Sequence, residues 1–207
     1  MSVVATVIHV VDDDASFRTA ISRLLRAAGY AVKTYNSAGE FLLEPSNDGA
    51  GCVLLDVRMP GPSGLELQEA LSKRGDSRPV IFLTGHGDIP QSVRAMRQGA
   101  ADFLTKPVRR PELLAAIRSA LERQNAEAAM AGRRKELAER FGTLTPRERQ
   151  VFDLVVAGRL NKQIAAALGT SERTIKAHRS RIMEKMQVDS VAALVHTDGW
   201  LRPRAGS

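Results

Sequence analysis

At 207 residues, the chain is long enough for one or two domains with packed cores. Its single cysteine, Cys52, excludes an internal disulfide, and its longest apolar runs are strand-sized, which excludes a membrane-spanning helix. Because the N-terminus also lacks the basic start of a signal peptide, we expect a cytoplasmic protein that does not bind membranes.

The charge is unevenly distributed along the chain. Residues 1–122 hold 14 basic and 14 acidic side chains, whereas residues 123–207 hold 16 and 9, which accounts for the whole net charge of +7. A basic half joined to a neutral half indicates that only the second half binds a polyanion. A basic solvated surface without a ligand is the alternative.

The first half alternates between strand-like and helix-like runs. The expected strands cover residues 4–11, 31–35, 52–56, 79–84 and 101–105, and the expected helices cover residues 15–28, 37–43, 64–74, 90–98 and 110 onward. Such alternation predicts βαβ units around a parallel sheet. We therefore expect an α/β flavodoxin-like domain over residues 1–122, with five parallel strands in the order 2-1-3-4-5.

Polar residues stand at the ends of four of these strands. Asp12 and Asp13 end the first, Asp56 ends the third, Thr84 ends the fourth and Lys106 follows the fifth. The carboxyl ends of parallel strands meet at one edge of a sheet, so these side chains are expected to converge. Oxygen ligands favour Mg²⁺, a carboxylate can attack phosphorus, and ammonium and hydroxyl groups bind phosphate oxygens. The pattern therefore predicts a phosphoryl-transfer site.

The second half is predicted to be helical throughout. Residues 123–141 carry few large apolar side chains and are expected to form a helical linker, with a frayed or disordered linker as the alternative. Residues 142–207 are expected to form a small all-α domain, with a disordered tail from about residue 202. Its helices are expected to start at four capping positions: Thr145, Asn161, Ser171 and either Asp189 or Ser190.

The second and third helices of this domain are separated by a short turn, the spacing of a helix-turn-helix. On the third helix, Ile175, Ile182 and Met186 share one face and are expected to be core residues. The opposite face carries basic, hydroxyl and small side chains, which suit base edges and phosphates in a major groove. The predicted DNA contacts are Asn161, Lys162, Ser171, Arg173, Thr174, Lys176, Ala177, Arg179, Ser180 and Arg181, with Arg179 at the edge of the face.

Four motifs of the first half resemble the receiver domain of two-component response regulators. They are Val10–Asp14, Leu55–Gly61, Leu83–Asp88 and Phe103–Pro107. The resemblance implies that Asp56 is the phosphoacceptor and that Thr84, Lys106 and Phe103 respond to the phosphoryl group. It also implies that Asp13, Asp56 and the main-chain carbonyl of Arg58 bind Mg²⁺, with Asp12 acting mostly through water. A cis bond between Lys106 and Pro107 is implied as well.

Three motifs of the second half look like the LuxR-type DNA-binding domain: Leu144–Val151, Asn161–Ala165 and Thr174–His178. Together, the two halves resemble a FixJ-type response regulator. The resemblance implies a sensor histidine kinase as phosphate donor, promoter DNA as ligand, and a homodimer after phosphorylation. The dimer contact would fall on Val191, Leu194 and Val195 of the last helix. No enzymatic activity is expected beyond the phosphorylation chemistry at Asp56.

Two alternatives stay open at this point. The chain could be a constitutive transcription factor whose receiver is a phosphorylation-independent interaction module. The segment Asp12–Ser16 also fits the Asp-x-Asp-x-Thr/Ser pattern of haloacid-dehalogenase-like phosphohydrolases, in which Asp12 would be the nucleophile. The second alternative leaves the basic half unexplained.

Overall fold

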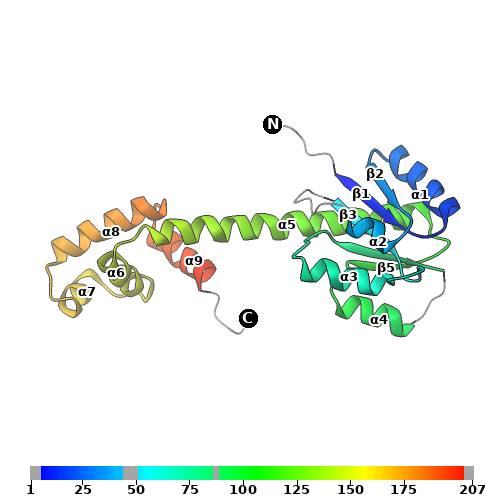
Figure 1. Ribbon diagram of the computed structural model, residues 1–207. Coiled ribbons are helices and arrows are strands. Elements are labelled where there is room, and N and C mark those ends of the chain that lie inside the picture. Colours follow the sequence, from blue (N-terminus) through cyan, green and yellow to red (C-terminus); the bar gives the residue numbers. More distant parts are fainter. Residues whose placement is uncertain (1–5, 44–50, 86–88, 203–207) are drawn as a thin grey trace. The chain divides into compact units, whose positions relative to one another are not determined.

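The computed structural model describes residues 6–43, 51–85 and 89–202, and the chain forms two compact units, Met1–Glu127 and Ala128–Ser207 (Figure 1). Residues 203–207 of the predicted tail, and residues 86–88 of the third receiver motif, lie outside the described residues. Among the helices that are described, none combines the length and the apolar character needed to cross a bilayer.

The first unit contains a five-stranded parallel sheet (Figure 1). Its strands are β1 (Val7–Val11), β2 (Ala31–Tyr35), β3 (Gly51–Asp56), β4 (Val80–Thr84) and β5 (Asp102–Thr105). They pair in the order β2-β1-β3-β4-β5, which confirms the predicted topology.

Five helices accompany the sheet: α1 (Ala15–Ala27), α2 (Ala38–Leu42), α3 (Gly64–Lys73), α4 (Ile89–Arg97) and α5 (Arg110–Gly142). Alternate residues of β4 show how both faces of the sheet are covered. Ile81 and Leu83 belong to an apolar cluster with α1 and α5, whereas Val80 and Phe82 belong to one with α2, α3 and α4. Burial on both faces explains why the central strands are apolar without alternation.

The predicted linker, residues 123–141, lies inside α5 and is helical. The boundary between the compact units falls within the same helix, at Glu127 and Ala128. Towards its C-terminal end, α5 contributes Leu137, which is buried, and Phe141, which packs against the core of the second unit. The first two turns of α5 supply Leu113 and Ile117 to the core of the first unit.

The second unit contains α6 (Pro146–Val156), α7 (Asn161–Ala167), α8 (Glu172–Met186) and α9 (Val191–Leu201). Thr145, Ser171 and Ser190 cap α6, α8 and α9 through their hydroxyl oxygens, as predicted.

The predicted cap at Asn161 is wrong. Leu160 occupies the N-cap position of α7, and its main-chain N–H donates to Gln163 Oε1 at 3.0 Å. Asn161 is the first residue inside the helix, and its side chain is used elsewhere.

Candidate functional site

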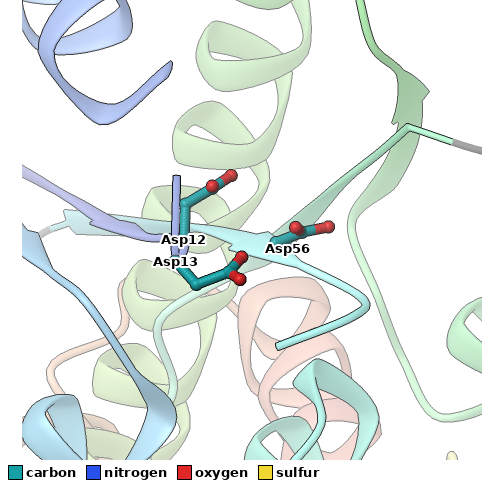
Figure 2. A group of neighbouring side chains, drawn as sticks. All are labelled: Asp12, Asp13 and Asp56. Carbon is teal, nitrogen blue, oxygen red and sulfur yellow. The ribbon is translucent and has the colours of Figure 1, made fainter. Parts of the chain in front are cut away.

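Three carboxylates meet at the carboxyl edge of the sheet (Figure 2). β1 and β3 are neighbours and Val11 is paired with Leu55, so the next residue of each strand, Asp12 and Asp56, stands beside the other. With Asp13, they bring one carboxylate oxygen each to within 4.8 Å of the others. Asp12 is 1% exposed and Asp56 is 9% exposed, whereas Asp13 is open to solvent.

Lys106 supplies a positive charge to this cluster from the end of β5. Its Nζ lies 2.5 Å from Asp12 Oδ2 and 3.2 Å from Asp56 Oδ2. Burial raises the pKa of Asp12 above its ordinary value, and the hydrogen bond from Lys106 offsets part of that increase. Buried carboxylates in close contact require cations to stay ionised, so the cluster favours binding of a further positive charge.

The remaining predicted residues of this site lie on β4 and β5 or just after β3 and β5. Thr84 is buried at the end of β4, and its carbonyl accepts from the Lys106 N–H at 2.7 Å, which joins the ends of β4 and β5. The Lys106–Pro107 bond is cis, as the resemblance implies. Phe103 is half-buried, with its ring centroid 6.1 Å from that of Phe82. The main-chain N–H of Arg58 lies 3.5 Å from Asp56 Oδ1, and the metal-ligand role of its carbonyl stays a prediction.

Three residues at the start of α1 also contact the site, and the sequence did not single out any of them: Asp14, Phe17 and Arg18. Asp14 caps α1 by accepting from the main-chain N–H groups of Phe17 and Ser16 at 3.1 and 2.8 Å, which lowers the pKa of Asp14. The cap fixes Phe17 in the first turn, where its ring centroid lies 4.1 Å from Lys106 Nζ. Arg18 Nη1 donates to the main-chain carbonyl of Asp12 at 2.6 Å. The signal available in the sequence was Asp14, a residue type that favours the N-cap position, directly before the helix-forming run that begins at Ala15.

Gly64, the first residue of α3, packs against the main chain of the candidate phosphoacceptor, Asp56. A Cβ at this position would be 2.2 Å from the main-chain oxygen of Asp56, a distance that real Cβ atoms do not adopt. The main-chain N–H of Gly64 donates to the Val57 carbonyl at 3.1 Å. Glycine is therefore required for α3 to begin this close to the end of β3.

The donor set at this edge suits a hard divalent cation, because every ligand atom that Asp12, Asp13 and Asp56 offer is a carboxylate oxygen. Asp12 is a poorer candidate nucleophile than Asp56, because it is more deeply buried and both of its carboxylate oxygens accept closer contacts. Its Oδ1 accepts from the Asp14 N–H at 3.0 Å and its Oδ2 from Lys106. This arrangement argues against the phosphohydrolase alternative.

The predicted DNA-contacting face is largely solvent-exposed. Ile175, Ile182 and Met186 of α8 are buried in the core of the second unit, which confirms the predicted facing of this helix. Eight of the predicted contacts are exposed: Lys162, Ser171, Arg173, Thr174, Lys176, Ala177, Ser180 and Arg181. Asn161 and Arg179 are half-buried, and Arg179 Nη1 donates to Asn161 Oδ1 at 2.8 Å, joining α8 to α7.

An ion pair joins α6 to α8. Lys185 Nζ lies 2.6 Å from Glu148 Oε2 and also donates to the Thr143 carbonyl at 3.2 Å. The hydrogen bond from Lys185 lowers the pKa of Glu148, a carboxylate that also completes the capping box of α6 with Thr145.

The predicted dimer contact needs one correction. Val191 and Val195 of α9 are 36% and 45% exposed, but Leu194 is 1% exposed and lies in the core of its own unit. A residue buried within the protomer cannot contact a second copy, so Leu194 is a core residue. Of the three predicted residues, Val191 and Val195 stay available as the apolar part of such a surface.

Comparison with protein-family models finds two matches in this chain. The model described as the response regulator receiver domain matches residues 8–118, and the model described as bacterial regulatory proteins of the luxR family matches residues 142–197. The two matches fall in the two halves that the charge distribution distinguishes.

Curated relatives match nearly the whole chain. It is 47% identical to the response regulator protein TodT of Pseudomonas putida over 195 residues, which cover 94% of this chain and 86% of TodT. It is 44% identical to the transcriptional regulatory protein FixJ of Azorhizobium caulinodans over 188 residues, which cover 91% of this chain and 89% of that FixJ.

Solved structures show the same similarity. The low-resolution structure of the response regulator StyR has a TM-score of 0.83 and 45% identity, and the match covers 94% of this chain and 98% of StyR. Full-length FixJ from B. japonicum has a TM-score of 0.60 and 39% identity, with 95% and 97% covered.

Proposed function

Since this chain belongs to the response regulators that join a receiver domain to a LuxR-type DNA-binding domain, a family of transcription regulators, we propose that phosphorylation of Asp56 controls its binding to promoter DNA. The phosphoryl donor is a partner sensor histidine kinase. The observation that carries the proposal is the placement of Asp56 beside Asp12, Asp13 and Lys106 at one sheet edge.

Mg²⁺ is the proposed cofactor of this site. Asp12, Asp13, Asp56 and the main-chain carbonyl of Arg58 would hold it, because together they form an all-oxygen donor set with net negative charge. When bound, the ion neutralises charge on the transferring phosphoryl group. The buried Asp12 carboxylate, whose pKa burial raises, is stabilised in its charged form by any cation at this position.

Asp56 is the proposed nucleophile. One of its carboxylate oxygens attacks the phosphorus of a phosphohistidine, a P–O bond forms, and the P–N bond breaks with its electron pair going to the imidazole of the kinase. Lys106 Nζ, 3.2 Å from Asp56 Oδ2, is close enough to bind an oxygen of the phosphoryl group. The Thr84 hydroxyl binds another, and Phe103 repacks inward as the local structure adjusts.

The output is proposed to be DNA binding by a homodimer. The proposed DNA-contacting residues are the ten of α7, α8 and the turn between them, and Val191 and Val195 form the apolar part of the dimer contact. The proposed receiver covers residues 1–122, the linker residues 123–141 and the DNA-binding domain residues 142–207. We place the protein in the cytoplasm, where the promoter DNA that such a regulator binds is found.

Binding of beryllofluoride, a phosphoryl mimic, tests the assignment of Asp56. The full-length chain should bind it only when Mg²⁺ is present, and Asp56→Asn should bind none. The matched control is Asp102→Asn, at the start of β5 and away from the carboxylate cluster, which should bind like the wild type. Acid-labile phosphate found on Asp12 and absent from Asp56 after treatment with acetyl phosphate would overturn the assignment.

Phosphorylation-independent action of the receiver is a separate possibility and has its own test. Promoter DNA is titrated with the full-length chain before and after acetyl phosphate treatment, at one salt concentration. The proposal requires tighter binding after treatment, and a tenfold gain corresponds to only ~1.4 kcal/mol of coupling. Identical curves from chain that is demonstrably phosphorylated on Asp56 would favour a constitutive transcription factor.

A further inference from the structure

Phe17 contacts the lysine of the candidate site from the first turn of α1, a helix that carries none of the predicted metal ligands. Its ring centroid lies 4.1 Å from Lys106 Nζ, well inside the range of about 6 Å for a cation–π contact. The ring is half-buried and packs against the apolar cluster under α1 and α5, so it is a fixed surface.

The position of the ring follows from the local sequence. Asp14 ends the acidic run and caps α1, and the main-chain N–H of Phe17 donates to its carboxylate at 3.1 Å. This hydrogen bond fixes the main chain of Phe17 relative to the segment that carries Asp12 and Asp13. Lys106 arrives from β5, so the contact brings the two ends of the site together.

Among the described residues, Asp12, Asp56 and the face of Phe17 contact Lys106 Nζ, and the Asp14 carboxylate adds a weaker electrostatic attraction. The first two depend on carboxylate charge. A divalent cation bound by the same carboxylates neutralises that charge and repels the ammonium group. The attraction to the ring does not depend on the carboxylates, so its share in holding Lys106 increases when the metal is bound.

We propose that Phe17 is a positioning residue that keeps the Lys106 ammonium beside Asp56 when metal occupies the carboxylates. The proposal rests on the proposed function of this site. It differs from core packing, because packing needs only an apolar side chain of similar volume, whereas holding the ammonium needs an aromatic face.

Phosphorylation of the full-length chain by acetyl phosphate with Mg²⁺ tests this role. Acetyl phosphate is a small-molecule donor, so loss of contact with a kinase cannot lower the rate. Phe17→Leu should lower the rate of Asp56 phosphorylation by about fivefold, the factor that corresponds to ~1 kcal/mol, and Phe17→Tyr should restore most of it because it keeps the ring. A leucine variant that reacts at the wild-type rate would overturn the proposal, as would a tyrosine variant as slow as leucine.

Leu24→Ala is the matched control. Leu24 lies two turns further along α1 and packs half-buried against the same cluster, and it takes no part in the ion pairs or the cation–π contact described for Lys106. The alanine variant should lower the midpoint of thermal unfolding by at least as much as Phe17→Leu while reacting at the wild-type rate. If it slows phosphorylation as much as Phe17→Leu does, general loosening of α1 explains the effect and the proposal fails.

The outcomes also separate this inference from the function on which it rests. Labelling that persists in Asp56→Asn would remove the proposed function. Labelling of the wild type on Asp56, with no difference between leucine and phenylalanine at position 17, would remove only the role of Phe17.

Discussion

Replacing Gly64 by alanine should slow phosphorylation of Asp56 without touching any charged group of the site. A Cβ at position 64 would stand 2.2 Å from the Asp56 main-chain oxygen and 3.1 Å from its carbonyl carbon. A contact under 3.0 Å is essentially never seen for a Cβ atom, and the atom at 2.2 Å is main chain, so the start of α3 or the end of β3 must move. A displacement of about 1 Å at a reacting group can cost on the order of 100-fold in rate.

The rate of acetyl phosphate labelling of Asp56 measures this effect, and thermal unfolding reports how much folded protein each sample holds. Gly39→Ala is the matched control. Gly39 also lies in the first turn of a helix that a serine caps, but among the described residues its added Cβ would meet only Ser37 Oγ, at an ordinary 3.9 Å. Labelling of folded Gly64→Ala at the wild-type rate would show that the position of Asp56 does not depend on the close approach of α3.

Three further outcomes follow from the described contacts. Lys176→Ala should weaken binding to a specific operator by about 1–3 kcal/mol, and Arg179→Ala should reduce the salt slope by about 1; unchanged operator affinity of the first variant at fixed salt would show that the recognition helix is misassigned. Burial raises the pKa of Cys52 to about 12, so at neutral pH its thiol should react with a thiol reagent only after unfolding, and rapid reaction of the native protein would contradict its burial. Lys185→Met should destabilise the second unit by about 1 kcal/mol at pH 7, because Lys185 stabilises the ionised form of Glu148 and lowers its pKa. The difference in stability from wild type should shrink as the pH falls below 4.5, the ordinary pKa of the carboxyl, and Glu148 becomes protonated. A difference that is the same at pH 3 would exclude the ion pair as its cause.

The sheet and its polar edge could be predicted because each strand carries its own signal. Val53 and Leu55 face one helical layer, and Cys52 and Leu54 face the other. The strand β3 is therefore apolar on both faces until Asp56, its last residue. Parallel pairing then places all such ends at one edge, whatever the details of the helices.

The contributions of Phe17 and Gly64 could not be predicted in the same way. Each depends on a contact that only the folded chain creates. Phe17 contacts Lys106, which is distant in the sequence, and Gly64 at the start of α3 approaches the main chain of Asp56 at the end of β3. Residue type alone says that a phenylalanine near the start of a helix is apolar and that a glycine there is permissive. It does not say what lies opposite.

The two errors in the second unit have similar causes. Leu160 and Asn161 compete for the same helix start, and the hydrogen bond from the Leu160 N–H to Gln163 decides it, which leaves Asn161 to pair with Arg179 of α8. Leu194 shares a helical face with Val191, but in a small all-α unit part of each helix must supply the core. Periodicity identifies an apolar face without saying which of its residues the protomer itself covers.

The charge distribution limits how phosphorylation can act on DNA binding. The receiver half is neutral, and a phosphoryl group adds negative charge to it, so bulk attraction to DNA cannot increase. A gain in affinity must come either from release of a restrained monomer or from dimerisation.

Dimerisation through α9 would bring two basic domains to one DNA, and the second would bind at the high effective concentration set by the first. The number of phosphates neutralised would then rise, and the dependence of log K on log salt would become about twice as steep. Release of a monomer would shift the affinity at every salt concentration and leave that slope unchanged. Titrations at several salt concentrations, with and without beryllofluoride, therefore distinguish the two mechanisms, and an unchanged slope would exclude a DNA-bound dimer as the source of the gain.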